Sequence, residues 1–348
     1  MPDIYFSHKS DTQEIPSVPS DGNFPSSKPK KSTFKRIVKI IFSLLIVLAV
    51  VFTGLTSYIF SLMQKTDYTG DYGKNNVYVS KSDLLHDKDV INVLLIGIDA
   101  RANDVASRSD SMMLFTIDKI NKKIKLTSFM RDTWVTLPKN KSYAKLNASC
   151  TYGGAEYVID TIEYNFNVDI DSYALVDFES FMSIVDSLGG VEVEVTKAEA
   201  ANLRNEFFLN VEAGENVHLD GNEALWYCRI RYLDSDFMRT FRQRKVLTAL
   251  FNKASKAGII KLISIANEVL PLVETNLSPS ELTKLSIYGA LFYRSYEIEQ
   301  ARIPIDGSWK DAFKKGQAVL EVDLGANQKF LEEFLYSKES TVSKSVDK

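Results

Sequence analysis

The chain has 348 residues, 45% of them hydrophobic, and a formal net charge of −3 at pH 7. This length is enough for one large domain or two small ones, and the charge gives no support for nucleic acid as a partner. Two cysteines, Cys150 and Cys228, exclude a disulfide-dense scaffold and a four-cysteine zinc site, and the sequence leaves open whether they pair.

The N-terminal region has the pattern of a membrane anchor. Residues 1–36 are rich in Pro, Ser and polar groups, end in a basic cluster and are predicted to form a disordered tail. Residues 40–63 contain no charge, so a transmembrane helix is predicted over 37–63, across about 30 Å of hydrocarbon. A cleaved signal peptide is disfavoured, because its apolar region would be only roughly 7–15 residues long.

The position of the basic cluster predicts the orientation. It precedes the apolar span, so the positive-inside rule puts the N-terminus in the cytoplasm and everything after Gln64 outside. We therefore expect a single-pass protein of the cell membrane. Its predicted parts are a cytoplasmic tail, an extracytoplasmic stalk over 64–89, one large folded domain over 90–336 and a flexible tail over 337–348.

The domain shows strands interleaved with helices, which indicates a layered α/β fold. The nearly continuous apolar run over 90–98 predicts a strand that is buried on both faces. Further strands are expected over 111–117, 123–129, 191–195 and 298–303. Helices are expected over 155–166, 178–188, 241–256, 259–270 and 279–293.

Eight of the twelve arginines fall in two blocks, a distribution that indicates phosphate binding, because guanidinium groups bind phosphate bidentately. In a strand, Arg229 and Arg231 would point to the same face and need an anion between them. For Arg242 and Arg244, a solvated helix face is an equally good explanation. The blocks are Arg101, Arg108 and Arg131, and then Arg229, Arg231, Arg239, Arg242 and Arg244.

Three aspartates complement these cations. Asp99 ends the first buried strand, where ligands of α/β sheets bind, and Asp110 precedes the second strand. Carboxylates beside phosphate-binding cations are typical of Mg²⁺ sites, so both are candidate metal ligands. Asp132 is more readily explained as the partner of a neighbouring arginine.

Other catalytic classes fit poorly. The three histidines lie in the tail, the stalk and an expected loop, and the sequence contains no zinc-protease helix, nucleophile elbow or Walker loop. Cys228 could be an activated nucleophile beside Arg229, but a buried structural cysteine is the more common case.

Six blocks, in order over roughly residues 90–250, together resemble the LytR-CpsA-Psr family. They are LLIGIDAR, RSDSMMLFTID, SFMRDTWV, KLNASCTYGG, DSLGGVEVEV and GNEALWYCRIRYLDSDFMRTFRQRKV. The resemblance implies a phosphotransferase that moves an anionic glycopolymer, such as wall teichoic acid or capsular polysaccharide, from undecaprenyl pyrophosphate to peptidoglycan. It also implies an α/β sandwich with a lipid-lined cavity. We therefore expect a three-layer αβα sandwich with a mixed central sheet, preceded by one transmembrane helix.

The resemblance also assigns roles to residues. Asp99 and Asp110 match the family's metal-associated carboxylates, which implies Mg²⁺, or Mn²⁺ in its place, as cofactor; with Arg131 they are the candidate catalytic residues. Two positions depart from the family's usual pattern, because Met130 replaces a proline and Met238 a glycine. The residues matched to pyrophosphate binding are Arg108, Arg131, Lys145, Arg229, Arg231, Asp236, Arg239 and Gln243, with Asp236 expected to orient Arg239.

Two alternatives to the transferase stay open at this point. A polyprenyl-pyrophosphate hydrolase would use the same site with water as acceptor. A non-enzymatic, lipid-binding regulator of the envelope would bind the same lipid without chemistry.

Overall fold

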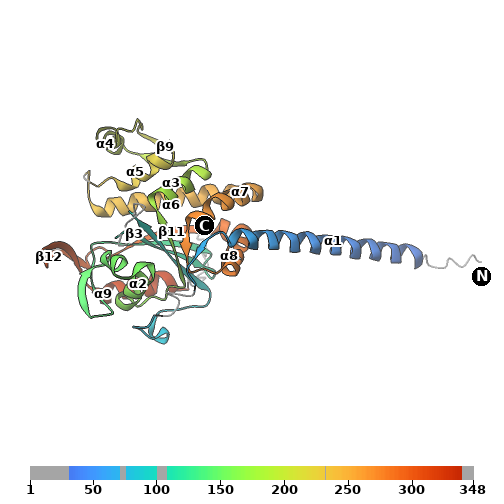
Figure 1. The fold of residues 1–348 in the computed structure, drawn as a ribbon, viewed down its shortest axis with the longest axis horizontal. Helices are drawn as coiled ribbons and strands as arrows, with labels where there is room; N and C mark the ends of the chain where they lie inside the picture. Colours follow the sequence, from blue (N-terminus) through green and yellow to red (C-terminus); the bar gives the residue numbers. More distant parts are fainter. Residues whose placement is uncertain (1–30, 71–75, 100–107, 232, 339–348) are drawn as a thin grey trace, which may run out of the picture. The chain divides into compact units, whose positions relative to one another are not determined.

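The computed structural model describes residues 31–70, 76–99, 108–231 and 233–338, and these fall into two units divided after Thr53. The expected N-terminal tail lies outside this description up to residue 30, and so does the expected C-terminal tail from residue 339. Within the second unit the family-like domain forms a layered α/β structure around one large sheet (Figure 1).

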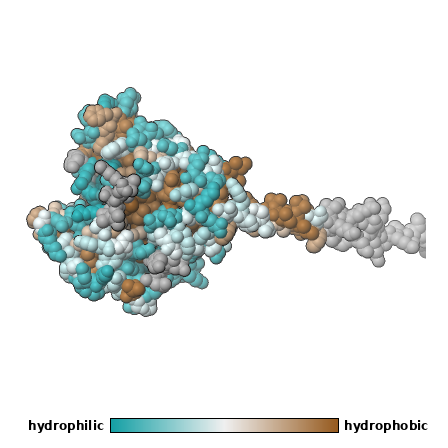
Figure 2. All heavy atoms as spheres, viewed as in Figure 1, coloured by the Kyte–Doolittle hydropathy of each residue, from teal (hydrophilic) through white to brown (hydrophobic). Residues whose placement is uncertain are grey.

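Helix α1, Lys31–Met63, contains the expected apolar span. Its stretch Ile41–Met63 is long and apolar enough to cross a membrane. Large apolar side chains of this stretch, such as Phe42 and Leu44, are more than half exposed, and Figure 2 shows hydrophobic residues along it. One apolar N-terminal helix is consistent with a membrane anchor.

The central sheet has seven strands in the order β1-β10-β7-β2-β3-β4-β11. Strand β2 runs parallel to β7 and antiparallel to β3, while β4 is antiparallel to β3 and parallel to β11, so the sheet is mixed, as expected. The strands are β1 (Asp67–Tyr68), β2 (Val90–Ile98), β3 (Ser109–Asp118), β4 (Lys123–Phe129), β7 (Ser172–Asp177), β10 (Glu274–Thr275) and β11 (Glu297–Ile303).

Helices cover both faces of this sheet, which gives three layers (Figure 1). Alternate residues of β3 face opposite cores, because successive side chains of a strand point to opposite sides: Leu114 packs with α2 and α9, and Met113 with α6 and α8. The helices are α2 (Ala148–Phe166), α6 (Asp236–Lys256), α8 (Pro279–Leu291) with the short η3 (Tyr293–Ser295), and α9 (Leu324–Tyr336). Helix α2 is interrupted at Gly153 and Gly154, so its regular part begins where the sequence predicted it.

A smaller lobe packs on the other side of α6 (Figure 1). Helix α6 serves both cores, since Val246 packs into the lobe and the next residue, Leu247, contacts both. The lobe consists of α3 (Phe178–Ser187), β8 (Val191–Val195), α4 (Lys197–Phe207), β9 (Gly214–Leu219) and α5 (Gly221–Arg229).

Two hairpins and three short elements complete the domain. The hairpins are β5 (Trp134–Leu137) with β6 (Ser142–Lys145), and β12 (Trp309–Lys314) with β13 (Gln317–Val322). The remaining elements are η1 (Lys81–Asp83), α7 (Ile259–Val269) and η2 (Leu270–Leu272). The sequence patterns did not predict either hairpin or α9. The helix predicted over 241–256 begins five residues after the first residue of α6.

Residues 64–89, taken from the sequence as a stalk, lie on the domain wherever the structure describes them. Strand β1 pairs with β10 at the sheet edge, and Leu85 bridges to Val168. Asn76 donates to the Glu163 carboxylate at 2.8 Å, and His86 Nδ1 lies 2.7 Å from Asp169. The described residues of this segment therefore contribute contacts to the folded domain.

Candidate active site

Three sheet strands bring the first group of predicted residues to one edge. Asp99 follows the end of β2, Asp110 lies at the start of β3 and Arg131 follows the end of β4. Because β3 is antiparallel to both neighbours, its start meets their ends, and the register pairs Ile98 with Ser109. The antiparallel order therefore brings together residues as far apart in the sequence as Asp99 and Arg131.

The second group comes from the connection between α5 and α6. Arg229 is the last residue of α5, and α6 begins with Asp236, capped by the Ser235 hydroxyl, which accepts from the Met238 N–H. Arg239 and Gln243 lie on the first turns of α6, four residues apart, and so share one face of the helix. Gln243 accepts a hydrogen bond from Ser111 of β3 at 3.1 Å, which ties α6 to the sheet edge.

These groups line two adjoining pockets. The polar pocket has a volume of about 360 Å³, and the apolar pocket one of about 280 Å³; they share Asp110, Arg131 and Arg231. The polar pocket is lined by Asp99, Arg108, Asp110, Arg131, Asp132, Lys145, Asn147 and Arg231. The apolar pocket adds Arg229, Arg239 and Gln243 to a wall of apolar residues that includes Leu95, Met113, Val176, Phe178, Phe181, Leu225 and Leu247.

Arg131 forms ion pairs with more than one carboxylate of the site. Its Nη1 donates to Asp110 Oδ1 at 2.5 Å, and its Nη2 lies 3.7 Å from Asp236 Oδ1. Arg239 Nε lies 2.8 Å from the same Asp236 oxygen, as expected for a carboxylate that orients Arg239. Burial lowers the pKa of Arg239, partly offset by Asp236, and Arg131 lowers it further.

The remaining charges divide into paired and unpaired groups. Asp132 pairs with Lys145, whose Nζ lies 2.6 Å from its Oδ1, while Arg131 Nε lies 4.0 Å from its other oxygen. Its nearer partner is therefore a lysine inside the pocket and not the neighbouring arginine that was expected. Arg229 Nη2 lies 3.7 Å from Asp99. Arg108 and Arg231 have no ion-pair partner within the described parts of the chain, so the pocket offers cations for an anionic ligand.

Comparison with known proteins matches residues 55–333 to the LytR-CpsA-Psr family. The chain belongs to this family. It is 35% identical to the teichoic acid transferase TagV of Bacillus subtilis over 56% of the chain and 51% of TagV, about half of that relative. It is 30% identical to TagU of Enterococcus faecalis over 87% of the chain and 99% of TagU. A solved structure of TagT bound to LIIa-WTA superposes with a TM-score of 0.62 at 27% identity, over 76% of the chain and 95% of TagT.

The two departures from the family's pattern are accommodated by the backbone. The Met130 N–H donates to the Ile303 carbonyl at 2.8 Å, a bond that a proline could not make. Met238 lies inside helix α6, where a residue other than glycine is favourable. Neither change displaces a charged side chain from the pockets.

Residues 229–231 do not form a strand, although the side-chain placement considered for a strand holds. Arg229 ends helix α5, Ile230 caps it, and Arg231 lies in the following irregular segment. Both arginines nevertheless line the apolar pocket, while the Ile230 side chain is fully buried. As in a strand, the side chain of Ile230 is therefore buried in the core, while those of the residues before and after it line the pocket.

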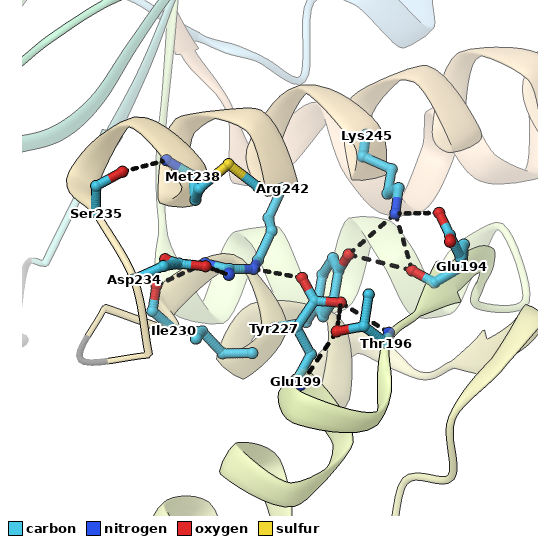
Figure 3. A network of polar contacts seen from close by, with 10 residues as sticks. All are labelled: Glu194, Thr196, Glu199, Tyr227, Ile230, Asp234, Ser235, Met238, Arg242 and Lys245. Atoms are coloured by element: carbon cyan, nitrogen blue, oxygen red, sulfur yellow. Dashed lines mark hydrogen bonds and ion pairs between the residues drawn. The ribbon is translucent and has the colours of Figure 1, made fainter.

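Arg242 and Arg244 have neither of the roles considered from the sequence, because both are buried outside the pockets. Arg242 is 1% exposed and donates to Glu199 at 2.7 Å, to Asp234 and to the carbonyl of Ile230 at 3.1 Å (Figure 3). Arg244 donates to the Ser128 hydroxyl at 2.8 Å. Arg242 thus fixes the backbone between the two pocket arginines. Arg101, of the first block, lies outside the described residues.

The cysteines are free, and both are buried. Burial raises the pKa of the Cys228 thiol to about 12, so it is protonated at neutral pH and is a poor nucleophile, although it lines the apolar pocket. The nucleophile hypothesis for Cys228 is therefore disfavoured, and its role is packing.

The donors of the polar pocket fit a Mg²⁺ ion. Asp99 and Asp110 line the same pocket as the unpaired cations. Among the described residues no group of three or more His, Cys, Asp and Glu could hold a metal by itself. Mg²⁺ commonly binds one or two carboxylates and takes its other ligands from substrate phosphates and water, so Asp99 and Asp110 are the residues that would hold it.

The sequence did not identify Asn147 as a residue of the pocket. Asn147 is 4% exposed, lines the polar pocket, and its Oδ1 has no hydrogen-bond partner in the part of the chain described here. Its place two residues after Lys145, in the block KLNASCTYGG, was the available signal.

Proposed function

We propose that this chain is a phosphotransferase that attaches an anionic glycopolymer, carried on undecaprenyl pyrophosphate, to peptidoglycan. The observation that carries the proposal is the junction of the two pockets at Asp110, Arg131 and Arg231. A cationic pocket that opens into an apolar one suits an amphiphile whose charged group joins directly to a hydrocarbon chain. The relatives TagU and TagV, named as teichoic acid transferases, and TagT bound to LIIa-WTA support wall teichoic acid as the polymer class, with capsular polysaccharide as the alternative.

The pyrophosphate binds the arginines, and the lipid enters the apolar pocket. Arg108 and Arg231 are the cations with free donors, and Arg131 adds a side chain held in place by Asp110 and Asp236. Guanidinium groups donate to phosphate oxygens in pairs and keep their charge at all relevant pH values. Side chains such as Leu95, Phe181 and Leu247 cover the first isoprene units.

In the reaction, a sugar hydroxyl of peptidoglycan attacks the phosphorus that carries the polymer. The new phosphorus–oxygen bond forms a phosphodiester, the bond to the bridging oxygen breaks, and undecaprenyl phosphate leaves. Asp99 or Asp110 accepts the hydroxyl proton. The arginines neutralise charge on the leaving phosphate, which is the largest electrostatic contribution of the chain's own residues. Mg²⁺, or Mn²⁺, held by Asp99 and Asp110 would supply further neutralisation of phosphate charge.

The test uses the full-length chain in detergent with a short prenyl pyrophosphate that carries a saccharide. Adding a peptidoglycan oligomer should give a saccharide–phosphate–peptidoglycan product and free prenyl phosphate. Release of prenyl phosphate at the same rate without the oligomer would instead show the hydrolase. Tight binding without any turnover would show the non-enzymatic regulator.

The domain lies outside the cell in this proposal, because its acceptor is peptidoglycan. The basic residues before the apolar span support this orientation. In a Ser80→Cys variant, the new thiol lies on an exposed segment, whereas Cys150 and Cys228 are buried. A membrane-impermeant thiol reagent should label this variant in intact cells and leave the parent chain unlabelled. Protection of the new thiol until the cells are broken would reverse the orientation.

A further inference from the structure

Helix α7 is apolar along most of its length, yet the domain covers little of it. Its sequence is IIKLISIANEV, and none of its residues, all of which the structure describes, is buried. Ile260 is 82% exposed and Ile259 is 54% exposed. A helix as apolar as this one normally buries its apolar side chains, so a partner other than water is expected for this surface.

The C-terminal end of α1 belongs to the same unit as α7 and lies beside it. The side-chain amide of Asn267 donates to the Tyr58 hydroxyl at 3.4 Å, and its oxygen accepts a hydrogen bond from Lys65 Nζ at 2.8 Å. Farther along both segments, the Asp67 N–H donates to the Val273 carbonyl at 3.2 Å. The chain that leaves α1 therefore follows α7 and η2 in the same direction.

This direction places the start of α7 at the level of the apolar span. Ile260 precedes Asn267 by two turns of helix, which is about 10 Å, and Ile263 lies between them on the same face. Tyr58, the contact of Asn267, already lies within the apolar stretch Ile41–Met63. From Asn267 back to Ile260, α7 therefore runs further along that stretch. Figure 1 shows α7 on the side of the domain that carries the C-terminal end of α1.

The charges of α7 suit the surface of a membrane. Lys256, just before the helix, and Lys261 are exposed at the end that lies along the apolar span. Glu268, the exposed carboxylate of the helix, lies at the other end. Interfacial helices carry lysines beside apolar residues, because the long lysine side chain reaches the headgroups while its neighbours enter the acyl region. Anionic lipids favour this distribution of charge.

We infer that the first two turns of α7 insert into the bilayer beside α1 and form a second membrane contact of the domain. The inference rests on α1 as the membrane anchor and not on the reaction at the site. Interfacial helices bury their apolar face roughly 5–10 Å into the boundary of headgroups and acyl chains, a depth within reach of Ile259, Ile260 and Ile263. Because α7 also packs against α3, whose Phe178 and Phe181 line the apolar pocket, this contact would hold that pocket close to the membrane.

The test measures the depth of α7 in the full-length chain, reconstituted in nanodiscs of equal parts phosphatidylcholine and phosphatidylglycerol. The fluorophore NBD is attached to the new thiol of Ser264→Cys, an exposed position one turn after Ile260, since Cys150 and Cys228 are buried. A phospholipid with a nitroxide on its acyl chain should quench this label. Quenching by iodide in the water should be at least about five-fold weaker than for a label on the outside of the domain.

Phe313→Cys supplies that outside label. Phe313 is 75% exposed on β12, at the end of the domain away from α1 (Figure 1). Its label should be quenched by iodide and not by the lipid nitroxide.

Ile260→Asp tests which side chain drives the insertion. Ile260 is largely exposed, so its replacement should not disturb folding, which urea unfolding checks. Loss of one large apolar side chain should lower the ratio of inserted to free α7 by roughly ten-fold or more. The label at Ser264→Cys should then lose lipid quenching and gain iodide quenching. Phe313→Asp makes the same kind of change away from α7 and should alter neither signal.

Three results would overturn the inference. Equal access of iodide to the labels at Ser264→Cys and Phe313→Cys would leave α7 in water. Protection from iodide without lipid quenching would mean that a second copy of the chain covers the helix. A label at Leu48→Cys, in the apolar span, tests the anchor separately. If the lipid nitroxide did not quench it, α1 would not be in the bilayer, and the inference would fail with the anchor, whatever the transfer activity of the chain.

Discussion

Arg231 allows the sharpest test of the pyrophosphate site. It lines both the polar and the apolar pocket, and within the described parts of the chain it has no ion-pair partner. Arg231→Ala therefore removes a ligand contact without exposing a buried carboxylate. A hydrogen bond between charged groups contributes about 1.5–3 kcal/mol, so binding of a prenyl pyrophosphate should weaken by roughly 10- to 150-fold. The free energy of unfolding should change by less than about 0.5 kcal/mol.

Arg229 predicts a different signature. Its guanidinium lies 4.3 Å from the ring centre of Phe178 and 4.8 Å from that of Trp226, and it is 3.7 Å from Asp99. These contacts exist without ligand, so Arg229→Ala should weaken binding and also lower the free energy of unfolding by about 1 kcal/mol. Arg→Lys at either position keeps the charge but loses the planar fork, and should recover only part of the affinity.

The assay is direct binding of a short prenyl pyrophosphate to the full-length chain, read together with urea unfolding. Ile230→Val, between the two arginines, changes a fully buried side chain and should cost about 1 kcal/mol of stability with little effect on binding. Arg294→Ala removes an exposed arginine far along the chain and should alter neither quantity. Parental affinity in folded Arg229→Ala and Arg231→Ala variants would refute the pyrophosphate site and the transferase proposal built on it.

Three further predictions concern the metal, the buried arginine and pH. Asp110→Ala should abolish transfer in EDTA-treated, Mg²⁺-resupplied assays while the fold persists, and near-normal turnover would contradict the metal role. Arg242→Ala leaves Glu199 buried without its cation, so the free energy of unfolding should fall by about 3–5 kcal/mol in urea; an unchanged midpoint would contradict this. Burial raises the pKa of Glu163 to about 7, with Asp169 and Asp160 adding to the rise and hydrogen bonds from Ile170 and Asn76 opposing it. Because the pKa of Glu163 is higher in the folded than in the unfolded chain, its contribution to stability is full below about pH 4.5 and is lost as the pH rises through about 7. The free energy of unfolding should therefore fall by up to about 3 kcal/mol between about pH 5 and pH 8, and Glu163→Gln should reduce this fall.

Two central strands were predictable, β2 from its nearly continuous apolar run and β4 from the turn at Asn121–Lys122 that precedes it. Strand β2, Val90–Ile98, and strand β4, Lys123–Phe129, begin and end where the sequence placed them. The β12–β13 hairpin carries no such signal, since three positions of Trp309–Lys314 are exposed and the turn follows at Lys315 and Gly316. Its place is set by contacts far away in the sequence, such as the Leu320 N–H donating to the Asp132 carbonyl.

The segment around Arg229 shows how a wrong local structure can still give the right side-chain placement. The spacing of Arg229 and Arg231 would place both side chains on one face of a strand, but helix α5 ends at Arg229. Burial of Ile230 is the constraint common to both backbones, because its side chain must reach the core of the smaller lobe. Once Ile230 is fixed, both neighbours are directed to the pocket.

The sequence alone does not distinguish the arginines that line a pocket from those that are buried. Arg231 and Arg242 are chemically identical, and both lie in the same dense basic block, yet one faces a pocket and the other is 1% exposed. The difference lies in their partners: Glu199, on another helix, and Asp234 both neutralise Arg242. A buried cation needs such carboxylates, whereas a cation that binds substrate phosphate must be left without them. The unpaired cations of the described structure, and not the number of arginines in the sequence, therefore mark the anion site, and Arg242 serves it indirectly by holding the carbonyl of Ile230.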